Sequence, residues 1–109
     1  MWGMETFVTM LLFVRKQYAD AIREGRKPFE IRAGARYRNV RPGDVMSING
    51  AFRAVVTRVD RHTRDSLIAA MPDWSAAVQS CYPDNPGPYF VFHFGSSSDV
   101  QPKAPGLFD

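Results

Sequence analysis

Cysteine, histidine and glycine-rich phosphate loops are scarce in this chain. Its 109 residues contain one cysteine, Cys81, so no internal disulfide can form. The two histidines, His62 and His93, are isolated and show no metal-ligand spacing, so we expect no metal ion and no cofactor. No Walker-type or dinucleotide-type glycine loop is present. We therefore expect both histidines to be structural and the thiol of Cys81 to be packed and inert.

Long apolar runs are also missing. The stretch TFVTMLLFV (residues 6–14) is too short to span a bilayer. It has no basic residue before it and no small-residue cleavage site after it, so it is not typical of a signal peptide. We interpret it as a buried strand of a protein without a membrane partner. The single cysteine agrees with a cytoplasmic location.

Positive charge, in contrast, is concentrated in one part of the chain. Seven basic residues and two glutamates lie between Arg23 and Arg41, a local charge of +5 in a chain whose net charge is +3. Eleven of the fourteen basic residues are arginine, which suits planar contacts to phosphate or nucleobase edges. The alternative is an ordinary solvated surface. If the stretch is functional, four arginines should line or rim a cleft that attracts anions: Arg26, Arg32, Arg36 and Arg38.

The pattern of strands and helices predicts an α+β fold. β-Branched and aromatic runs predict strands at 6–14, 27–33 and 87–95, and Asn49-Gly50 predicts a hairpin between 44–48 and 51–59. Helical spacing predicts three short helices: 16–25, which ends at Gly25; 63–71, capped by Thr63; and 72–82, capped by Asp73. We predict a small twisted β-barrel of about five to six strands with two or three short helices. We expect residues 1–95 to form a single domain and residues 96–109 to form a flexible tail.

Alternation in the strand KPFEIR suggests a site. Side chains of a strand point alternately to its two faces, so Phe29 and Ile31 should face the core while Glu30 and Arg32 share the other face. Lys27, at the bend before the strand, could bring its amine to the same place. A surface salt bridge would also explain the two charged strand residues. The remaining predicted core residues are Val45, Ile48, Val56, Phe90, Phe92 and Phe94.

Seven residues of the chain match the sequence pattern of a known family. Gly25, Lys27, Glu30 and Arg32 match the G-x-K-x-x-E-x-R run of the ASCH domains, a branch of the PUA-like fold. Residues 42–44 match the P-G-D turn of that family, and SCYPDNPGPYFVFHF (80–94) is similar to the ending of small bacterial N4-acetylcytidine amidohydrolases. The resemblance covers residues 11–95 and implies a PUA-like barrel with a cleft for RNA or modified nucleosides.

The resemblance also implies roles for individual residues. In the amidohydrolases, a lysine, a threonine three residues later and a later glutamate do the chemistry. Lys27 matches the lysine, but Glu30 stands in place of the threonine and no glutamate follows it. We therefore expect a lysine–glutamate pair that activates water, with Lys27 as base if it is desolvated and Glu30 orienting the water or passing a proton.

The resulting hypothesis is an amidohydrolase that cleaves the N4-acyl amide of cytidine-type nucleosides. A non-catalytic module that binds RNA or a modified base is the first alternative, and a nuclease or a partner-binding domain is the second. No DNA specificity is expected. The predicted catalytic residues are Lys27 and Glu30, and the predicted substrate-binding residues are Arg26, Arg32, Tyr18, Tyr37 and Tyr89.

Overall fold

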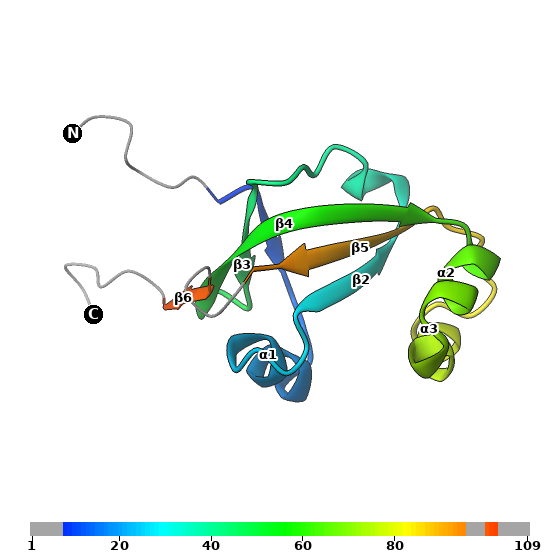
Figure 1. Cartoon of the computed structure of the whole chain (residues 1–109), viewed down its shortest axis with the longest axis horizontal. Coiled ribbons are helices and arrows are strands. Elements are labelled where there is room, and N and C mark those ends of the chain that lie inside the picture. The colour runs from blue at the N-terminus through cyan, green and yellow to red at the C-terminus, as the bar shows by residue number, and fades with distance from the viewer. Residues whose placement is uncertain (1–7, 96–99, 103–109) are drawn as a thin grey trace.

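One mixed β-sheet, curled into a half-barrel, organises the molecule (Figure 1). The computed structural model describes residues 8–95 and 100–102. Strand β1 runs parallel to β3, and all other neighbouring strands are antiparallel. Along the sheet the strands follow the order β1 (Met10–Leu12), β3 (Val45–Ile48), β4 (Phe52–His62), β5 (Tyr89–Phe94) and β2 (Phe29–Ala33), and β6 (Val100–Pro102) also pairs with β4.

In the described part of the chain, three short α-helices and two 3₁₀ turns accompany the sheet, which confirms the predicted α+β class. Figure 1 shows α1 near the start of β2, whereas α2 and α3 lie together beyond the end of β4. Their bounds are α1 (Lys16–Arg23), α2 (Arg64–Ala70) and α3 (Ser75–Cys81), with η1 (Ala35–Tyr37) and η2 (Pro72–Trp74). Thr63 caps α2 as predicted, because its side chain accepts a hydrogen bond from Ser66 N.

The barrel is half closed rather than complete. Strands β1 and β2 are the two edges of the sheet path, and within the described residues they do not pair with each other. A side chain spans the gap instead, since Arg32 Nη2 donates a hydrogen bond to the carbonyl oxygen of Phe13, just after β1, at 2.6 Å. Pro28, which cannot donate to a strand ladder, directly precedes the edge strand β2.

The predicted hairpin is present and anchors the first helix. Asn49 and Gly50 have φ values of 56° and 69°, the left-handed pair that a type I′ turn requires. The side-chain amide of Asn49 also bonds both backbone groups of Val14, accepting from its N–H at 2.7 Å and donating to its carbonyl at 2.8 Å. The turn therefore fixes the chain just before α1.

Apolar side chains form two clusters, one on each face of β5. Phe90, Phe92 and Phe94 belong to the larger cluster, as predicted. Tyr89 and Val91 point to the opposite face and pack with residues of α2 and α3 in the smaller cluster. The strand is thus buried on both faces, although only one buried face was expected.

The two faces of β2 pack differently from the prediction. Phe29 and Ile31 pack, half-buried, in the smaller cluster under the helices. Glu30 is the buried residue of the strand and lies opposite Phe92 in the register. The alternation was predicted correctly, and Phe29 and Ile31 do pack against apolar residues. They join the smaller cluster because helices α2 and α3 provide a second apolar layer, and the opposite face, with Glu30, is buried as well.

Three predicted boundaries also need correction. The first strand is short and covers Met10–Leu12, while residues 6 and 7 of the expected strand lie outside the described residues. Asp73 lies inside η2, and α3 begins without a side-chain cap. Of the expected flexible tail, 100–102 form the paired strand β6, and the rest lies outside the described residues.

Candidate functional site

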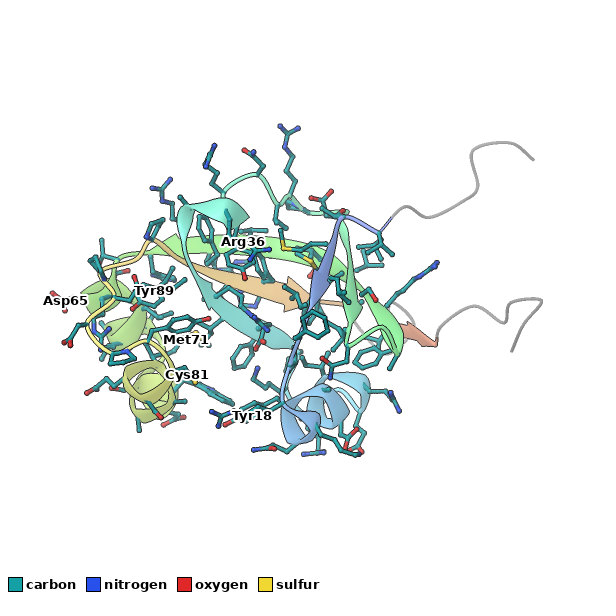
Figure 2. The ribbon with its side chains drawn as sticks, turned by 180° about the vertical axis from the view of Figure 1, so that it is seen from behind. Tyr18, Arg36, Asp65, Met71, Cys81 and Tyr89 are labelled. Carbon is teal, nitrogen blue, oxygen red and sulfur yellow. The ribbon has the colours of Figure 1, made fainter. Side chains whose placement is uncertain are left out.

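A pocket of about 170 Å³ lies at the edge strand β2, between α1 and α3. We call it the β2 pocket. In Figure 2 the side chains of Tyr18, from α1, and Cys81, from α3, lie toward the region between these helices. Both residues line the pocket. The charged residues that line it are Arg15, Lys27, Glu30 and Arg32, and the aromatic ones are Tyr18, Trp74 and Tyr82.

The end of α1 places Lys27 in this pocket. Gly25 has a φ of 79°, and the N–H groups of Gly25 and Arg26 bond back to the carbonyls of Ile22 and Ala21 at 3.1 and 2.9 Å. This pair of bonds is the Schellman motif, which ends a helix at a left-handed glycine. The chain turns sharply there, and Lys27 follows with 5% of its surface exposed.

The ammonium group of Lys27 is held by one carboxylate, one carbonyl and three aromatic rings. Its Nζ lies 2.8 Å from Glu30 Oε1 and 3.0 Å from the carbonyl oxygen of Phe29. The ring centroids of Tyr18, Phe29 and Trp74 lie 5.1, 5.0 and 5.2 Å from the same nitrogen. Aromatic faces attract a cation at this range, so the three rings add to the contacts that hold the ammonium group in place.

Glu30 connects Lys27 to Arg32. Its Oε1 accepts from Lys27 Nζ at 2.8 Å, and its Oε2 accepts from Arg32 Nη2 at 2.9 Å. Burial opposes the charge of Arg32, but the nearby charge and hydrogen bond of Glu30 outweigh it and raise the pKa of the guanidinium. The three side chains form a charge triad in which one buried carboxylate is shared by two cations, the buried Lys27 and the partly buried Arg32.

Aromatic side chains from different elements surround the triad. Trp74, from η2, makes edge contacts with Phe29 and Tyr18, with ring centroids 5.2 and 6.0 Å apart. Burial raises the pKa of the Tyr82 hydroxyl, although the positive charge of Arg32 opposes the rise. Tyr82 therefore remains a neutral phenol at ordinary pH and can donate a hydrogen bond.

The pocket gathers four of the seven predicted site residues: Tyr18, Lys27, Glu30 and Arg32. The predicted convergence of amine, carboxylate and guanidinium is therefore present in the structure.

The other three predicted site residues do not line this pocket. Arg26 is exposed and pairs with Glu24, with Nη2 and Oε2 2.6 Å apart. Tyr37 is buried against Phe92 in the larger cluster. Tyr89 is fully buried, and its hydroxyl contacts the carbonyl of Asn85. Both tyrosines were misassigned because a strand or turn aromatic looks the same in sequence whether it fills a core or stacks on a base.

The basic stretch as a whole does not form the pocket either. Only Arg32 of the four expected arginines lines it, whereas Arg36 and Arg38 are exposed around η1. Arg36 lies over the ring of Tyr37 at 5.1 Å, and Arg38 donates to the carbonyl of Ala35 at 3.2 Å. The cysteine prediction was also wrong, because Cys81 is exposed and lines the pocket.

Three residues that line the pocket were not predicted from the sequence: Arg15, Trp74 and Tyr82. Trp74 and Tyr82 come from η2 and the end of α3, whose packing against β2 is a tertiary feature without a local signal. Arg15 stands directly before α1 and carries no motif.

A second hollow, of about 530 Å³, lies beside β4 and the end of α2. Asp60 accepts hydrogen bonds from Arg58 Nε at 2.9 Å and pairs with His93 Nε2 at 2.8 Å. Burial tends to raise the pKa of Asp60, but these two partners outweigh it and lower the pKa. His62 likewise has a neighbour, Ser66 Oγ, at 2.5 Å. Both histidines are thus engaged in local contacts.

Residues 8–95 and 100–102 contain no group of three or more histidine, cysteine or acidic side chains arranged to hold a metal ion. Over the same residues, no helix has the length and apolar character needed to cross a membrane.

Comparison with known proteins supports the fold alone. No family model and no curated protein matches the chain, so the resemblance to the ASCH domains stays a prediction. Among solved structures, the crystal structure of hypothetical protein PH0355 is similar, with a TM-score of 0.65 over 85% of this chain and 97% of that chain. At 14% sequence identity, the likeness concerns the arrangement of the backbone.

Proposed function

We propose that the β2 pocket hydrolyses the N4-acyl amide of a cytidine-type substrate. The observation that carries the proposal is the buried ion pair, 2.8 Å from Lys27 Nζ to Glu30 Oε1, on the wall of an aromatic pocket. A small pocket that contains a paired amine and carboxylate suits a reaction on a single planar base. A long basic groove would instead suit binding of an RNA strand.

The size and lining of the pocket fit a pyrimidine. A volume of about 170 Å³ is well below the ~300 Å³ at which pockets for drug-sized ligands begin. It suits a single base with a small acyl group, while a ribose would lie toward the mouth. The rings of Tyr18, Trp74 and Tyr82 line the pocket, and aromatic faces of this kind stack on nucleobases.

The charge triad provides the groups that amide hydrolysis needs. Lys27 has three N–H donors and uses two of them on Glu30 and the carbonyl of Phe29, so the third can donate to the acyl oxygen as negative charge develops. Glu30 keeps acceptor sites for a water molecule beyond its bonds to Lys27 and Arg32.

In the proposed reaction, the water attacks the acyl carbon and passes its proton to Glu30. The carbon–nitrogen bond then breaks, the proton moves from Glu30 to N4, and the products are a free carboxylic acid and the cytidine amine. This assignment makes Glu30 the base and keeps Lys27 charged, the reverse of the expectation from sequence. The ion pair with Glu30 and the aromatic rings around Lys27 make its side chain a hydrogen-bond donor in this reaction. No threonine nucleophile is required.

The test compares two site variants with a matched surface variant. Glu30→Gln removes the base, and Lys27→Met removes the donor while filling the space among the rings. Each should lower kcat for N4-acetylcytidine by about a hundredfold or more, the usual scale for a general acid–base group. Lys16→Gln is the control, because Lys16 is exposed and pairs with Asp20 outside the pocket.

The hydrolysis is followed by ultraviolet absorbance, and the folded state of each variant is checked by circular dichroism at the assay temperature. Wild-type protein without amidase activity, or full activity in both site variants, would refute the proposal. Binding of N4-acetylcytidine without turnover would instead support the binding-module alternative.

A further inference from the structure

The β2 pocket carries more positive charge than a neutral nucleoside can balance. Three cationic side chains line it, Arg15, Lys27 and Arg32, against the single carboxylate of Glu30, a formal balance of +2. Lys27 and Arg32 both bind that carboxylate, on its two different oxygens. One carboxylate therefore serves two cations, and Arg15 adds a further charge at the exposed side of the pocket.

Unlike Lys16 beside it, Arg15 has no acidic partner among the described residues. Within residues 8–95 and 100–102, its guanidinium makes no ion pair. Lys16, the next residue, is paired with Asp20, with Nζ and Oδ2 2.9 Å apart, and Arg26 is paired with Glu24. The side chain of Arg15 also makes no capping bond to α1. With respect to the described part of the chain, its five N–H donors are therefore open to a ligand.

Arg15 lies on the side of the pocket where a substituent on the ribose of a bound nucleoside would be. The buried part of the pocket, beside Lys27 and Glu30, is filled by the base in the proposed function. The sugar then lies toward solvent, where Arg15 is the exposed cation that lines the pocket. A phosphate monoester carries a charge of about −1.5 to −2 at pH 7, which nearly neutralises the formal charge of the pocket. A phosphodiester of RNA carries a single negative charge and would neutralise less of it.

We propose that the substrate is an N4-acylated cytidine monophosphate and that Arg15 binds its phosphate monoester. The inference rests on the proposed function for the identity of the base, but the phosphate contact itself does not depend on catalysis. Arginine suits this contact because its planar fork can donate two parallel hydrogen bonds to phosphate oxygens.

The activity test compares kcat/KM for N4-acetylcytidine and for its 5′- and 3′-monophosphates. Wild-type protein should prefer at least one monophosphate by about tenfold to a hundredfold, the scale of one hydrogen bond between charged groups. In Arg15→Gln the preference should fall to near unity, whereas Lys16→Gln should keep it. Because the contact is electrostatic and exposed, the preference should also shrink as salt is raised.

A binding test separates this inference from the proposed function. The fluorescence of Trp74, measured in a Trp2→Phe background, should report binding of cytidine monophosphate in the pocket. Tighter binding of the monophosphate than of cytidine, lost in Arg15→Gln, would support the phosphate site even if no amidase activity is found. Equal kcat/KM for nucleoside and monophosphates would overturn the inference while leaving the amidase intact. Turnover of an acetylated RNA oligonucleotide in preference to both monophosphates would overturn it as well.

Discussion

Removing the shared carboxylate should destabilise the protein more than removing its lysine partner. Glu30→Gln leaves Lys27 and Arg32 facing each other without a counter-charge, in a site where the side chains of Lys27 and Glu30 are 6% and 10% exposed. Breaking a buried ion pair from one side costs about 3–5 kcal/mol. Lys27→Met leaves Glu30 paired with Arg32, and the thioether can pack against the surrounding rings. We expect this second change to cost about 1–3 kcal/mol, the range for a lost buried hydrogen bond.

Urea unfolding followed by circular dichroism measures both free energies, and the double variant completes the cycle. Once Lys27 is absent, the loss of Glu30 leaves one cation without a counter-charge rather than two. The effects of the two single variants on the free energy of unfolding should therefore not add. A loss of about 3 kcal/mol also corresponds to a fall in melting temperature of about 10 °C or more for a domain of this size. A Glu30→Gln effect below about 1 kcal/mol, or a larger effect for Lys27→Met, would refute the view that the carboxylate is the shared centre of the triad.

Three further predictions concern pH and backbone. The pKa of Asp60 is lowered in the native state, so near pH 4 the native state binds fewer protons than the unfolded chain. The stability that the Asp60 carboxylate contributes is therefore lost as pH falls through its native pKa. Asp60→Asn should weaken this part of the acid dependence of the urea midpoint. The pKa of the Tyr82 hydroxyl is raised in the native state, so as pH rises the unfolded chain loses the hydroxyl proton first. The free energy of unfolding should therefore fall above about pH 10. Tyr82→Phe should make that fall shallower. Gly87→Ala should lower the melting temperature, because the added Cβ would lie 2.8 Å from Cδ2 of Tyr89, and an unchanged melting temperature would contradict this.

Local rules predicted most elements of the fold. The type I′ hairpin, the glycine that ends α1 and the threonine cap of α2 each depend on residues close in sequence. Alternation also identified β5 and its phenylalanine face correctly. These features are predictable because the chemistry that fixes them is contained within a few residues.

The assignment of faces required tertiary information. Phe29 and Ile31 alternate as predicted but face α2 and α3, because these helices add a second apolar layer to the sheet. Tyr89 looked like a stacking residue for the same reason, since a strand covered on both sides buries both of its faces. Sequence periodicity gives the alternation of a strand but not which layer will cover each side.

The site was partly predictable. Lys27, Glu30 and Arg32 lie within six residues, so strand geometry was sufficient to bring them together. Arg15 and Trp74 lie on separate elements that only the folded chain brings to the same pocket. The exposed arginines of the basic stretch misled the prediction, because a local charge excess does not say which side chains fold toward a cleft.

The most direct test of the proposed chemistry is to measure both products of one reaction. Purified wild-type protein is incubated with N4-acetylcytidine and its monophosphates, and the deacetylated product and acetate are quantified by chromatography over time. The Lys27–Glu30 site predicts equal amounts of both products in repeated turnovers, with a loss of about a hundredfold or more in Glu30→Gln. Intact substrate after prolonged incubation with folded wild-type protein, or equal rates in Glu30→Gln, would contradict it.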